Sequence, residues 1–143
     1  MSSKTVVPKG CTNLKLRRLT RLVSAQCEPF FSASGLTTTQ YSLLGHVEQL
    51  GPIAPGQLAR EMDLDASTLT RNLQPLLGAG LAELLPGEDA RSRIVQATPA
   101  GRALRAEVKA QWKRAQLSIN AKLGEARVQR LHELLDECLE LMR

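Results

Sequence analysis

The stretch of sequence that decides the fold is residues 63–93, DLDASTLTRNLQPLLGAGLAELLPGEDARSR. Asp65 is a typical N-cap residue and predicts the start of a helix, which Gly78 and Gly80 would end. The apolar residues between these limits recur at spacings of three and four. They therefore form one inward face of the helix, made by Leu69, Leu73, Leu76 and Leu77.

A β-hairpin is predicted directly after this helix. Two short apolar runs occupy residues 81–85 and 94–97, and the polar turn Pro86–Asp89 follows the first of them. Thr98 and Pro99 then predict the start of another helix, because proline suits the first helical position.

Two further helices are predicted upstream. Thr37 and Gln40 form a capping-box pattern, and the helix that they begin would end at Gly51–Pro52. The next helix begins near Pro55. Because only Asp63–Asp65 separates it from the helix after Asp65, the pair is typical of a helix-turn-helix. With the hairpin behind it, the pattern predicts a winged helix-turn-helix.

Helices are also predicted at both ends of the chain. Residues 12–31 carry apolar side chains at helical spacing, and the helix that begins at Pro99 runs to about Asn120. A last helix follows Gly124. Its apolar arc covers about half of the circumference, which is wider than one core-facing stripe requires and favours a subunit interface. The fold class is mainly α with a small β-hairpin wing.

Length and composition suit one globular domain of 143 residues. No apolar run approaches the roughly 18 residues that cross a membrane, and residues 1–10 lack the apolar region of a secretory signal. We therefore expect a cytoplasmic protein with no membrane partner. Three cysteines without a CxxC pair argue against disulfides and zinc, and we expect no metal and no cofactor. The net charge of +5 suggests a polyanionic partner.

The outer face of the helix after Asp65 is the first candidate site. With the leucines turned inward, its polar side chains can reach phosphates or base edges, and arginine can hold guanine through two hydrogen bonds. An ordinary solvated helix face is also polar, but this one has neither Lys nor Glu. The candidate DNA contacts are Ser67, Thr68, Thr70, Arg71 and Gln74.

The tip of the hairpin is the second candidate site. A narrow minor groove attracts arginine, and Asp89 stands two residues before Arg91, where its carboxylate could hold the loop and aim the guanidinium. Arg93 completes the set of candidate contacts. An ordinary solvated turn would have the same composition.

Pro75 conflicts with the predicted helix. It removes one backbone donor and crowds the carbonyl of Arg71, at a cost of about 3 kcal/mol. The helix therefore either kinks or ends early. Because Leu76 and Leu77 keep the helical period, we expect a kinked continuation.

Four motifs occur in one order along the chain: GLTTTQY (residues 35–41), STLTRNL (67–73), Gly80–Leu81, and the run from Asp89 and Arg91 to Gly101. Together they resemble the MarR (multiple antibiotic resistance regulator) family of winged helix-turn-helix transcriptional regulators. The resemblance spans roughly residues 12–142. One departure is Ala97, since the family's LT-x-x-G segment has Leu at that place.

The resemblance implies one MarR-like domain over residues 1–143. Its winged-helix DNA-binding region would span residues 37–98, and helices in 11–33 and 99–143 would intertwine across a two-fold axis into a homodimer. Such dimers bind pseudo-palindromic operators in double-stranded DNA, with the helix in the major groove and the wing in the minor groove. The resemblance further implies a repressor that a small aromatic or phenolic effector releases from DNA.

The sequence leaves the switch open. An effector would lie between the DNA-binding and dimerisation regions, and Phe30, His46 and Trp112 are candidate lining residues by position only. Alternatively, oxidation of Cys11 would switch the repressor, because the cations around it favour the thiolate. An incidental thiol is the ordinary explanation. The other two cysteines lie in apolar stripes and are expected to be inert core residues, Cys27 and Cys138.

Other classes of protein fit less well. The sequence has no GxSxG, P-loop or GxGxxG motif, and residues 132–136 miss the HExxH zinc motif at its last residue, so we expect no enzyme. A winged helix used only for protein–protein contact is the remaining alternative.

Overall fold

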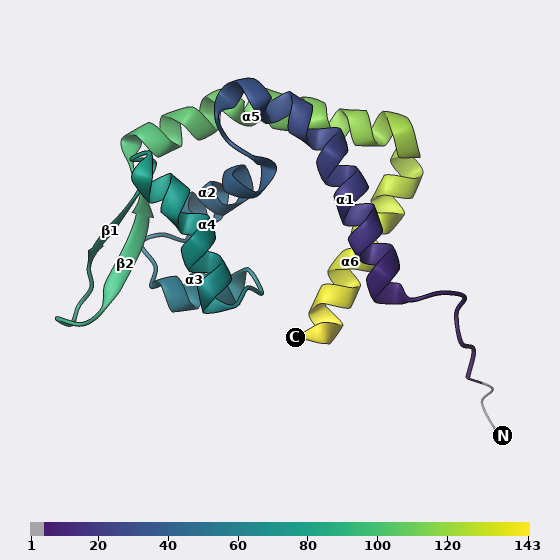
Figure 1. Ribbon diagram of the computed structural model, residues 1–143, viewed down its shortest axis with the longest axis horizontal. Helices are drawn as coiled ribbons and strands as arrows, with labels where there is room; N and C mark the ends of the chain where they lie inside the picture. Colours follow the sequence, from purple (N-terminus) through teal and green to yellow (C-terminus); the bar gives the residue numbers. More distant parts are fainter. Residues whose placement is uncertain (1–4) are drawn as a thin grey trace. The chain divides into compact units, whose positions relative to one another are not determined.

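The structure, a computed structural model, describes residues 5–143 (Figure 1). The chain forms two compact units, one made by Phe30–Arg114 and one by the segments before and after it. In chain order the elements are α1 (Thr12–Phe31), the 3-10 turn η1 (Ser32–Ser34), α2 (Thr38–Leu50), α3 (Pro55–Glu61), α4 (Ala66–Gly78), β1 (Ala82–Pro86), β2 (Arg93–Ala97), α5 (Pro99–Leu123) and α6 (Glu125–Met142).

The predicted fold class, mainly α with one β-hairpin, is confirmed. Residues 5–11 form neither helix nor strand, and the start of the chain at residues 1–4 lies outside the described part. Within residues 5–143, no helix is long and apolar enough to cross a membrane.

The predicted helix starts are confirmed by their capping geometry. At α2 the Gln40 N–H donates to the Thr37 hydroxyl oxygen (3.1 Å), and the Thr37 N–H donates to the Gln40 side-chain oxygen (3.0 Å). Pro55 opens α3, where its missing N–H costs no helical hydrogen bond. The Thr98 hydroxyl accepts the Gly101 N–H (3.1 Å) at the start of α5. These local contacts place α2, α3 and α5 where the sequence predicted them.

A tight turn joins α3 to α4. Asp63 takes the left-handed conformation (φ 54°), and the Leu64 N–H donates to the Ala59 carbonyl (2.8 Å). Aspartate tolerates this conformation better than most residues, which allows the chain to reverse within a few positions. After the turn, α4 runs through Pro75 to Gly78, so the predicted continuation of the helix past proline is confirmed.

The core of the Phe30–Arg114 unit lies where α2, α3 and α4 pack on one another and on the hairpin. From α4, three of the four predicted leucines are buried, while Leu77 is half-buried at the edge of that face. Removing such aliphatic side chains from water is the main force that holds helices of this size together. The fully buried large side chains in this core include Leu43, Leu44, Val47, Leu58, Leu69, Leu76 and Val95.

The hairpin is antiparallel, with Ala82 opposite Ala97 and Pro86 opposite Arg93. Its strands begin and end within one residue of the predicted runs. Ile53, in the loop between α2 and α3, forms an isolated antiparallel bridge to Val95 of β2. Its N–H donates to the Val95 carbonyl (3.1 Å), and the Val95 N–H donates back (2.8 Å). This bridge ties the base of the hairpin to the helices.

The start of α5 is held against the end of α4 by the segment Gly80–Leu81. The Thr98 hydroxyl donates to the Gly80 carbonyl (2.6 Å), and the Thr98 N–H donates to the Leu81 carbonyl (3.1 Å). Gly101 lies directly over Leu81, so closely that a Cβ atom at this position would collide with the Leu81 carbonyl oxygen. The backbone contact therefore requires glycine at position 101.

The other unit contains most of α1, the end of α5, and α6. Cys27 is buried as predicted, and burial, aided by the charge of Glu28, raises the pKa of its thiol. The prediction for Cys138 is wrong, because this residue is exposed. The reason is that no residue of α6 is buried by its own chain. Helix α5 also runs further than predicted, to Leu123.

We expect Gly101→Ala to destabilise the protein by about 1–3 kcal/mol, because the new methyl group would overpack against the Leu81 backbone. Gly78→Ala is the matched control, since this glycine is also helical but has no atom within 4 Å of the added Cβ. That variant should be neutral or up to about 1 kcal/mol more stable, since alanine favours helix. Urea denaturation of both variants measures the difference. Equal effects of the two substitutions would contradict the close approach.

Candidate nucleic-acid interface

The N-terminus of α4 is fixed by Asp65. Its carboxylate accepts the Thr68 N–H (2.7 Å) and the Ser67 hydroxyl (2.9 Å). The hydrogen bond from the Thr68 backbone, followed by those from the Thr68 and Ser67 side chains, lowers the pKa of Asp65 below its ordinary value. Asp65 therefore stays ionised at neutral pH and holds the first turn of the helix.

The polar side chains on the predicted outer face of α4 are not equally available to bind a ligand, because some already make hydrogen bonds within the helix. Ser67 is tied to Asp65, and the Thr70 hydroxyl donates to the Ala66 carbonyl (2.9 Å). Arg71 is exposed, and its guanidinium makes one long hydrogen bond to the Thr68 hydroxyl (3.5 Å). Gln74 is exposed two turns into the helix. Arg71 and Gln74 are therefore the side chains best able to reach outward for a ligand.

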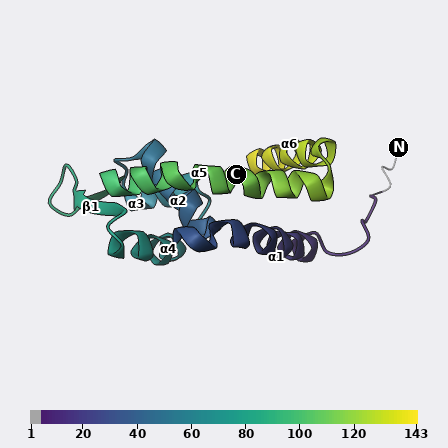
Figure 2. The same cartoon turned by 90° about the horizontal axis from the view of Figure 1, so that it is seen from above.

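The hairpin extends away from the helices that carry it, with its turn at the far end (Figures 1 and 2). Within the turn the Gly87 N–H donates to the Ser92 carbonyl (2.9 Å). The Ser92 hydroxyl accepts the Asp89 N–H (3.1 Å) and donates to the Asp89 carbonyl (3.0 Å). Ser92 thus closes the turn, a role that the sequence analysis missed although a serine opposite an aspartate is a common turn pair.

Asp89 braces the tip differently from the prediction. Its carboxylate accepts the backbone N–H of Arg91 (3.4 Å), and no ion pair joins it to the Arg91 guanidinium. The guanidinium is therefore not aimed by Asp89, because the short turn directs the carboxylate toward the backbone. Arg91 and Arg93 are both exposed, which leaves two cationic side chains at the tip and at the first residue of β2.

The residues predicted to line an effector site have contacts of their own. The His46 Nδ1 lies 2.8 Å from the Ser42 carbonyl, and Trp112, which is 41% exposed, stacks on the Tyr41 ring at 6.4 Å. Phe30 is half-buried. Cys11 belongs to the other unit, where its sulfur accepts the Leu14 N–H (3.5 Å) at the start of α1. An effector site lined by Phe30, His46 and Trp112 stays a prediction, as does a redox role of Cys11.

The Tyr41 ring also has a cation–π contact with Arg105, which sequence patterns did not predict. The Arg105 guanidinium from α5 lies 5.2 Å from the ring centroid and pairs with Glu48 (3.4 Å). The ring of Phe31 also packs against Tyr41, with 5.5 Å between the ring centroids. These contacts attach the first half of α5 to α2. They give Tyr41 a structural role in this unit.

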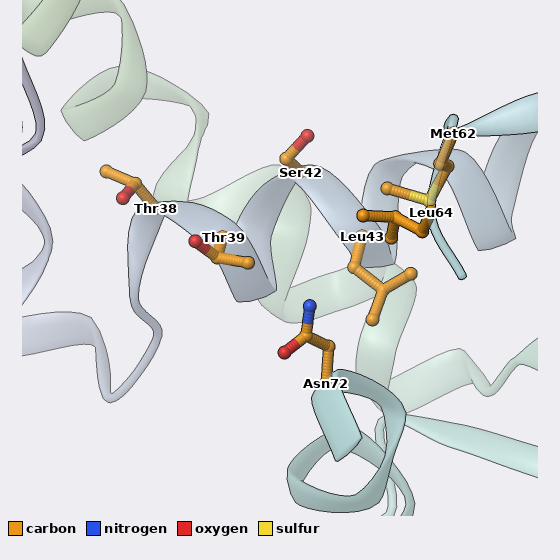
Figure 3. A pocket seen from close by; sticks show the side chains of 7 residues that line it. All are labelled: Thr38, Thr39, Ser42, Leu43, Met62, Leu64 and Asn72. Carbon is orange, nitrogen blue, oxygen red and sulfur yellow. The ribbon is translucent and has the colours of Figure 1, made fainter. Parts of the chain in front are cut away.

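Each of the two units contains a cavity. The first, of about 300 Å³, lies between α2, the α3–α4 turn and α4 (Figure 3). The second, of about 250 Å³, lies between α1, α5 and α6 and is lined mostly by leucine, valine and isoleucine. Neither is lined by Phe30, His46 or Trp112.

Comparison with known proteins agrees with this geometry. The sequence model of the MarR family matches residues 34–92, which hold α2 to the tip of the hairpin. The chain is also similar in structure to the transcriptional regulator MosR from M. tuberculosis in complex with DNA. The two sequences are 30% identical. The match covers 94% of this chain and 99% of MosR, with a TM-score of 0.77. The chain belongs to the MarR family.

Two further relatives carry the family name. The multiple antibiotic resistance protein MarR of Salmonella typhimurium is 36% identical over 76 residues, which are 52% of this chain and 53% of that protein. The match thus spans about half the length of this curated relative. A cysteine-to-serine mutant of MarR from E. coli, complexed with operator DNA, is 25% identical, with 89% and 95% of the two chains covered and a TM-score of 0.75.

The structure explains what the residues at the family's LT-x-x-G segment, Ala97 to Gly101, do in this chain. The threonine of the segment, Thr98, caps α5 and bonds to Gly80, and the glycine admits the Leu81 backbone. Ala97, where the family has Leu, is buried opposite Ala82 in the hairpin. The alanine pair fills that position with two small side chains, so the departure does not disturb the strand register.

We expect Asp65→Ala to lower the melting temperature at neutral pH, because the Thr68 N–H and the Ser67 hydroxyl lose their acceptor. Since the folded protein lowers the pKa of Asp65, the contribution of its carboxylate is full above the ordinary value of 3.8. It is lost as the pH falls through the lower folded-state pKa. The gap in melting temperature between the parent and Asp65→Ala should therefore shrink below about pH 4.

Asp65→Asn is the matched control for this titration. Asparagine also caps helices well but has no carboxylate, so its advantage over alanine should persist across the same pH range. A parent-to-alanine gap that is unchanged by acid would show that the ionised carboxylate does not hold the cap.

Proposed function

We propose that this MarR-family protein is a transcriptional regulator that binds double-stranded DNA as a homodimer and works in the cytoplasm. The observation that carries the proposal is the division of α4 into two faces. Leu69, Leu73 and Leu76 are buried, while Arg71 and Gln74 are exposed on the outer side. A capped helix whose polar face projects from a helix-turn-helix is the element that enters a major groove.

The hairpin supplies the second contact in this proposal. Arg91 is exposed in the turn and Arg93 at the first residue of β2, and the turn is the end of the hairpin furthest from the helices that carry it (Figure 2). Arginine is the side chain that a narrow minor groove attracts most strongly, because its planar cation matches the negative potential there. Ser92 and Asp89 keep the turn closed, so the cations are presented on a rigid support.

The named complexes of relatives support the same partner. MosR was crystallised with DNA, and the E. coli MarR mutant with operator DNA. Both resemble this chain over nine-tenths of its length or close to it. We extend their partner to this protein, with a pseudo-palindromic operator as the target, because a two-fold dimer presents two identical reading helices.

The homodimer in this proposal is supported by the apolar surface of α6. Leu134 is 58% exposed, Leu139 51% and Leu141 78%, and no residue of this helix is buried. Exposed apolar surface of this extent on one helix marks an interaction site. Residues 11–33 and 99–143 are the proposed dimerisation region, and 37–98 the DNA-binding region of a single domain.

Release from DNA by a small aromatic or phenolic effector completes the proposal for a repressor. The alternative switch is oxidation of Cys11, which is exposed and so accessible to peroxide. Peroxide treatment of Cys11→Ser distinguishes the two. A redox repressor loses its response in this variant, and an effector-controlled one keeps it.

We expect Arg71→Ala to weaken binding to promoter DNA by about 1–3 kcal/mol, because this side chain is the available cation on the outer face of α4. Fluorescence anisotropy with labelled DNA from the flanking promoter, titrated against salt and competitor DNA, measures the change. Arg130→Ala is the matched control, since Arg130 is an exposed arginine of α6, a helix that is not proposed to contact DNA.

Equal loss in Arg71→Ala and Arg130→Ala would indicate that charge alone binds the DNA. If the parent protein selected no sequence from a library of genomic fragments, the regulator proposal would fail. A winged helix used only for protein–protein contact would then be the better explanation.

We expect Leu139→Glu to convert the protein to a monomer, because it places a charge in the exposed apolar face of α6. Analytical ultracentrifugation measures the molar mass in solution. Ala126→Glu adds the same side chain in the first turn of α6, on its polar side, and should leave the dimer intact. A parent protein that sediments as a monomer would contradict the dimer.

A further inference from the structure

Arg105 of α5 lies in a shallow trough on α2 that is made by Tyr41, Gly45 and Glu48. These three residues follow one another at spacings of four and three, so they form one stripe along the helix. The Arg105 guanidinium lies 5.2 Å from the centre of the Tyr41 ring, and its Nη1 lies 3.4 Å from the Glu48 carboxylate. Gly45 stands between these two partners and forms the floor of the trough.

The closeness of this contact requires glycine at position 45. A Cβ atom there would lie 2.7, 2.8 and 3.0 Å from Nη2, Nε and Cζ of Arg105. Glycine is less favourable than alanine inside a helix, and Gly45 is an interior residue of α2. The helix therefore loses local stability at the place where the arginine lies against its backbone.

The Arg105 side chain is held by its surroundings, although its hydrogen bonds are incomplete. Its Nε is buried and has no hydrogen-bond partner within residues 5–143. Buried donors are nearly always paired, so an unpaired one needs other contacts that hold the side chain where it is. The aromatic face of Tyr41 and the carboxylate of Glu48 are those contacts, and they keep the guanidinium on α2.

The Tyr41 ring also contacts the two helices that leave this unit. Phe31, the last residue of α1, packs against it with 5.5 Å between the ring centroids, and Trp112 of α5 stacks on it at 6.4 Å. The unit Phe30–Arg114 begins and ends within two residues of these contacts. One ring therefore meets both helices close to the points where they continue into the other unit.

Arg105 gives α5 a further attachment beyond its first turn. Thr98 and Gly101 hold the start of α5 against the Gly80–Leu81 segment. A helix held only at its first turn could pivot about that turn. Arg105 lies one turn after Gly101 and holds α5 on a different helix, α2. Attachments to two separate elements restrict the direction of α5 within this unit.

We propose that Arg105 is a positioning residue for DNA reading: held on Tyr41 and Glu48, it fixes the direction in which α5 leaves the Phe30–Arg114 unit. Because α5 is one continuous helix that belongs to both units, its direction there carries over into the other unit. In the proposed homodimer this direction sets the distance between the two α4 helices, and hence the spacing of half-sites that the dimer accepts. The inference rests on the proposed function, and it gives Arg105 no contact with DNA.

The test uses the whole chain and a DNA duplex that the parent protein selects from a randomised library. Three kinds of probe are made from this duplex. The first is the duplex itself with both half-sites, the second has one half-site scrambled, and the third has one base pair added or removed between the half-sites. Fluorescence anisotropy in the presence of competitor DNA gives the Kd of each probe.

We expect Arg105→Ala to bind the single half-site as the parent does, because Arg105 does not touch DNA. Its affinity for the complete duplex should fall at least about fivefold, since a less constrained α5 places the second reading helix less accurately. The penalty for one added or removed base pair should fall from at least about tenfold in the parent to about threefold or less. A residue that only stabilised the fold would weaken all probes equally and leave this penalty unchanged.

Two further variants test the trough itself. Gly45→Ala keeps every charge but displaces the guanidinium from the helix, and alanine favours helix, so α2 should persist. It should lose spacing discrimination as Arg105→Ala does, and it decides the question if Arg105→Ala does not fold. Arg105→Lys keeps a cation that Tyr41 and Glu48 can hold, so its spacing penalty should lie between those of the parent and Arg105→Ala.

Lys109→Ala is the matched control, since it removes an equal charge from an exposed position of α5 one turn later. It should match the parent on every probe. The same loss of discrimination in Lys109→Ala would overturn the positioning role, because charge alone would then be the cause. Thermal melting by circular dichroism shows which variants are folded at the assay temperature.

The outcomes separate this role from the proposed function. A spacing penalty that is unchanged in Arg105→Ala and in Gly45→Ala would overturn the positioning role while DNA binding stood. Equal losses on the single half-site and the complete duplex would also overturn it. A parent protein that selected no duplex at all would refute the proposed function, and the positioning role would fall with it.

Discussion

The burial of the three leucines on α4 is the constraint on which the rest of the structure depends. Leu69, Leu73 and Leu76 can leave water only against α2, α3 and the base of the hairpin, so their contacts fix the rotation of the helix about its own axis. Once that rotation is fixed, the opposite side has to face outward with Arg71 and Gln74. The proposed reading face is thus a consequence of core packing. It needs no contact of its own to hold it in place.

A second constraint links the reading helix to the wing and to α5. The chain leaves α4 through Gly80 and Leu81, and both carbonyls accept hydrogen bonds from Thr98. The Gly101 backbone closes over the same point. Three elements therefore meet within a few backbone atoms, where a helix end, a strand start and a helix start share donors and acceptors. Such a junction has little room to adjust, which explains why a threonine and a glycine three residues apart form a motif.

The same region shows how stability and function compete for one helix. The N-terminal polar residues of α4 are used to cap and close its first turn through Asp65, Ser67 and Thr70. Further along, Arg71, Asn72 and Gln74 have no strong hydrogen-bond partner among residues 5–143, and they point in different directions. Arg71 and Gln74 are turned to solvent, whereas Asn72 is turned toward α2. Polar groups left uncommitted beside a well-packed core are the ones available to ligands.

Local chemistry in the sequence determined the element order, the capping residues Thr37, Asp65 and Thr98, and the continuation of α4 past Pro75, because each of these depends on residues within one or two helical turns. It also singled out the outer face of α4, since helical periodicity alone separates Arg71 from the leucines. Tertiary structure decided what periodicity cannot express. Ser92, not the Arg91 guanidinium, is the main partner of Asp89, because turn geometry sets which atoms meet. The Tyr41 ring is contacted by Arg105, which lies 64 residues later in the chain, and Cys138 is exposed because none of the described residues packs over its side of α6. The cavity beside Asn72 likewise exists only where three separate segments pack, and so no single stretch of sequence could disclose it.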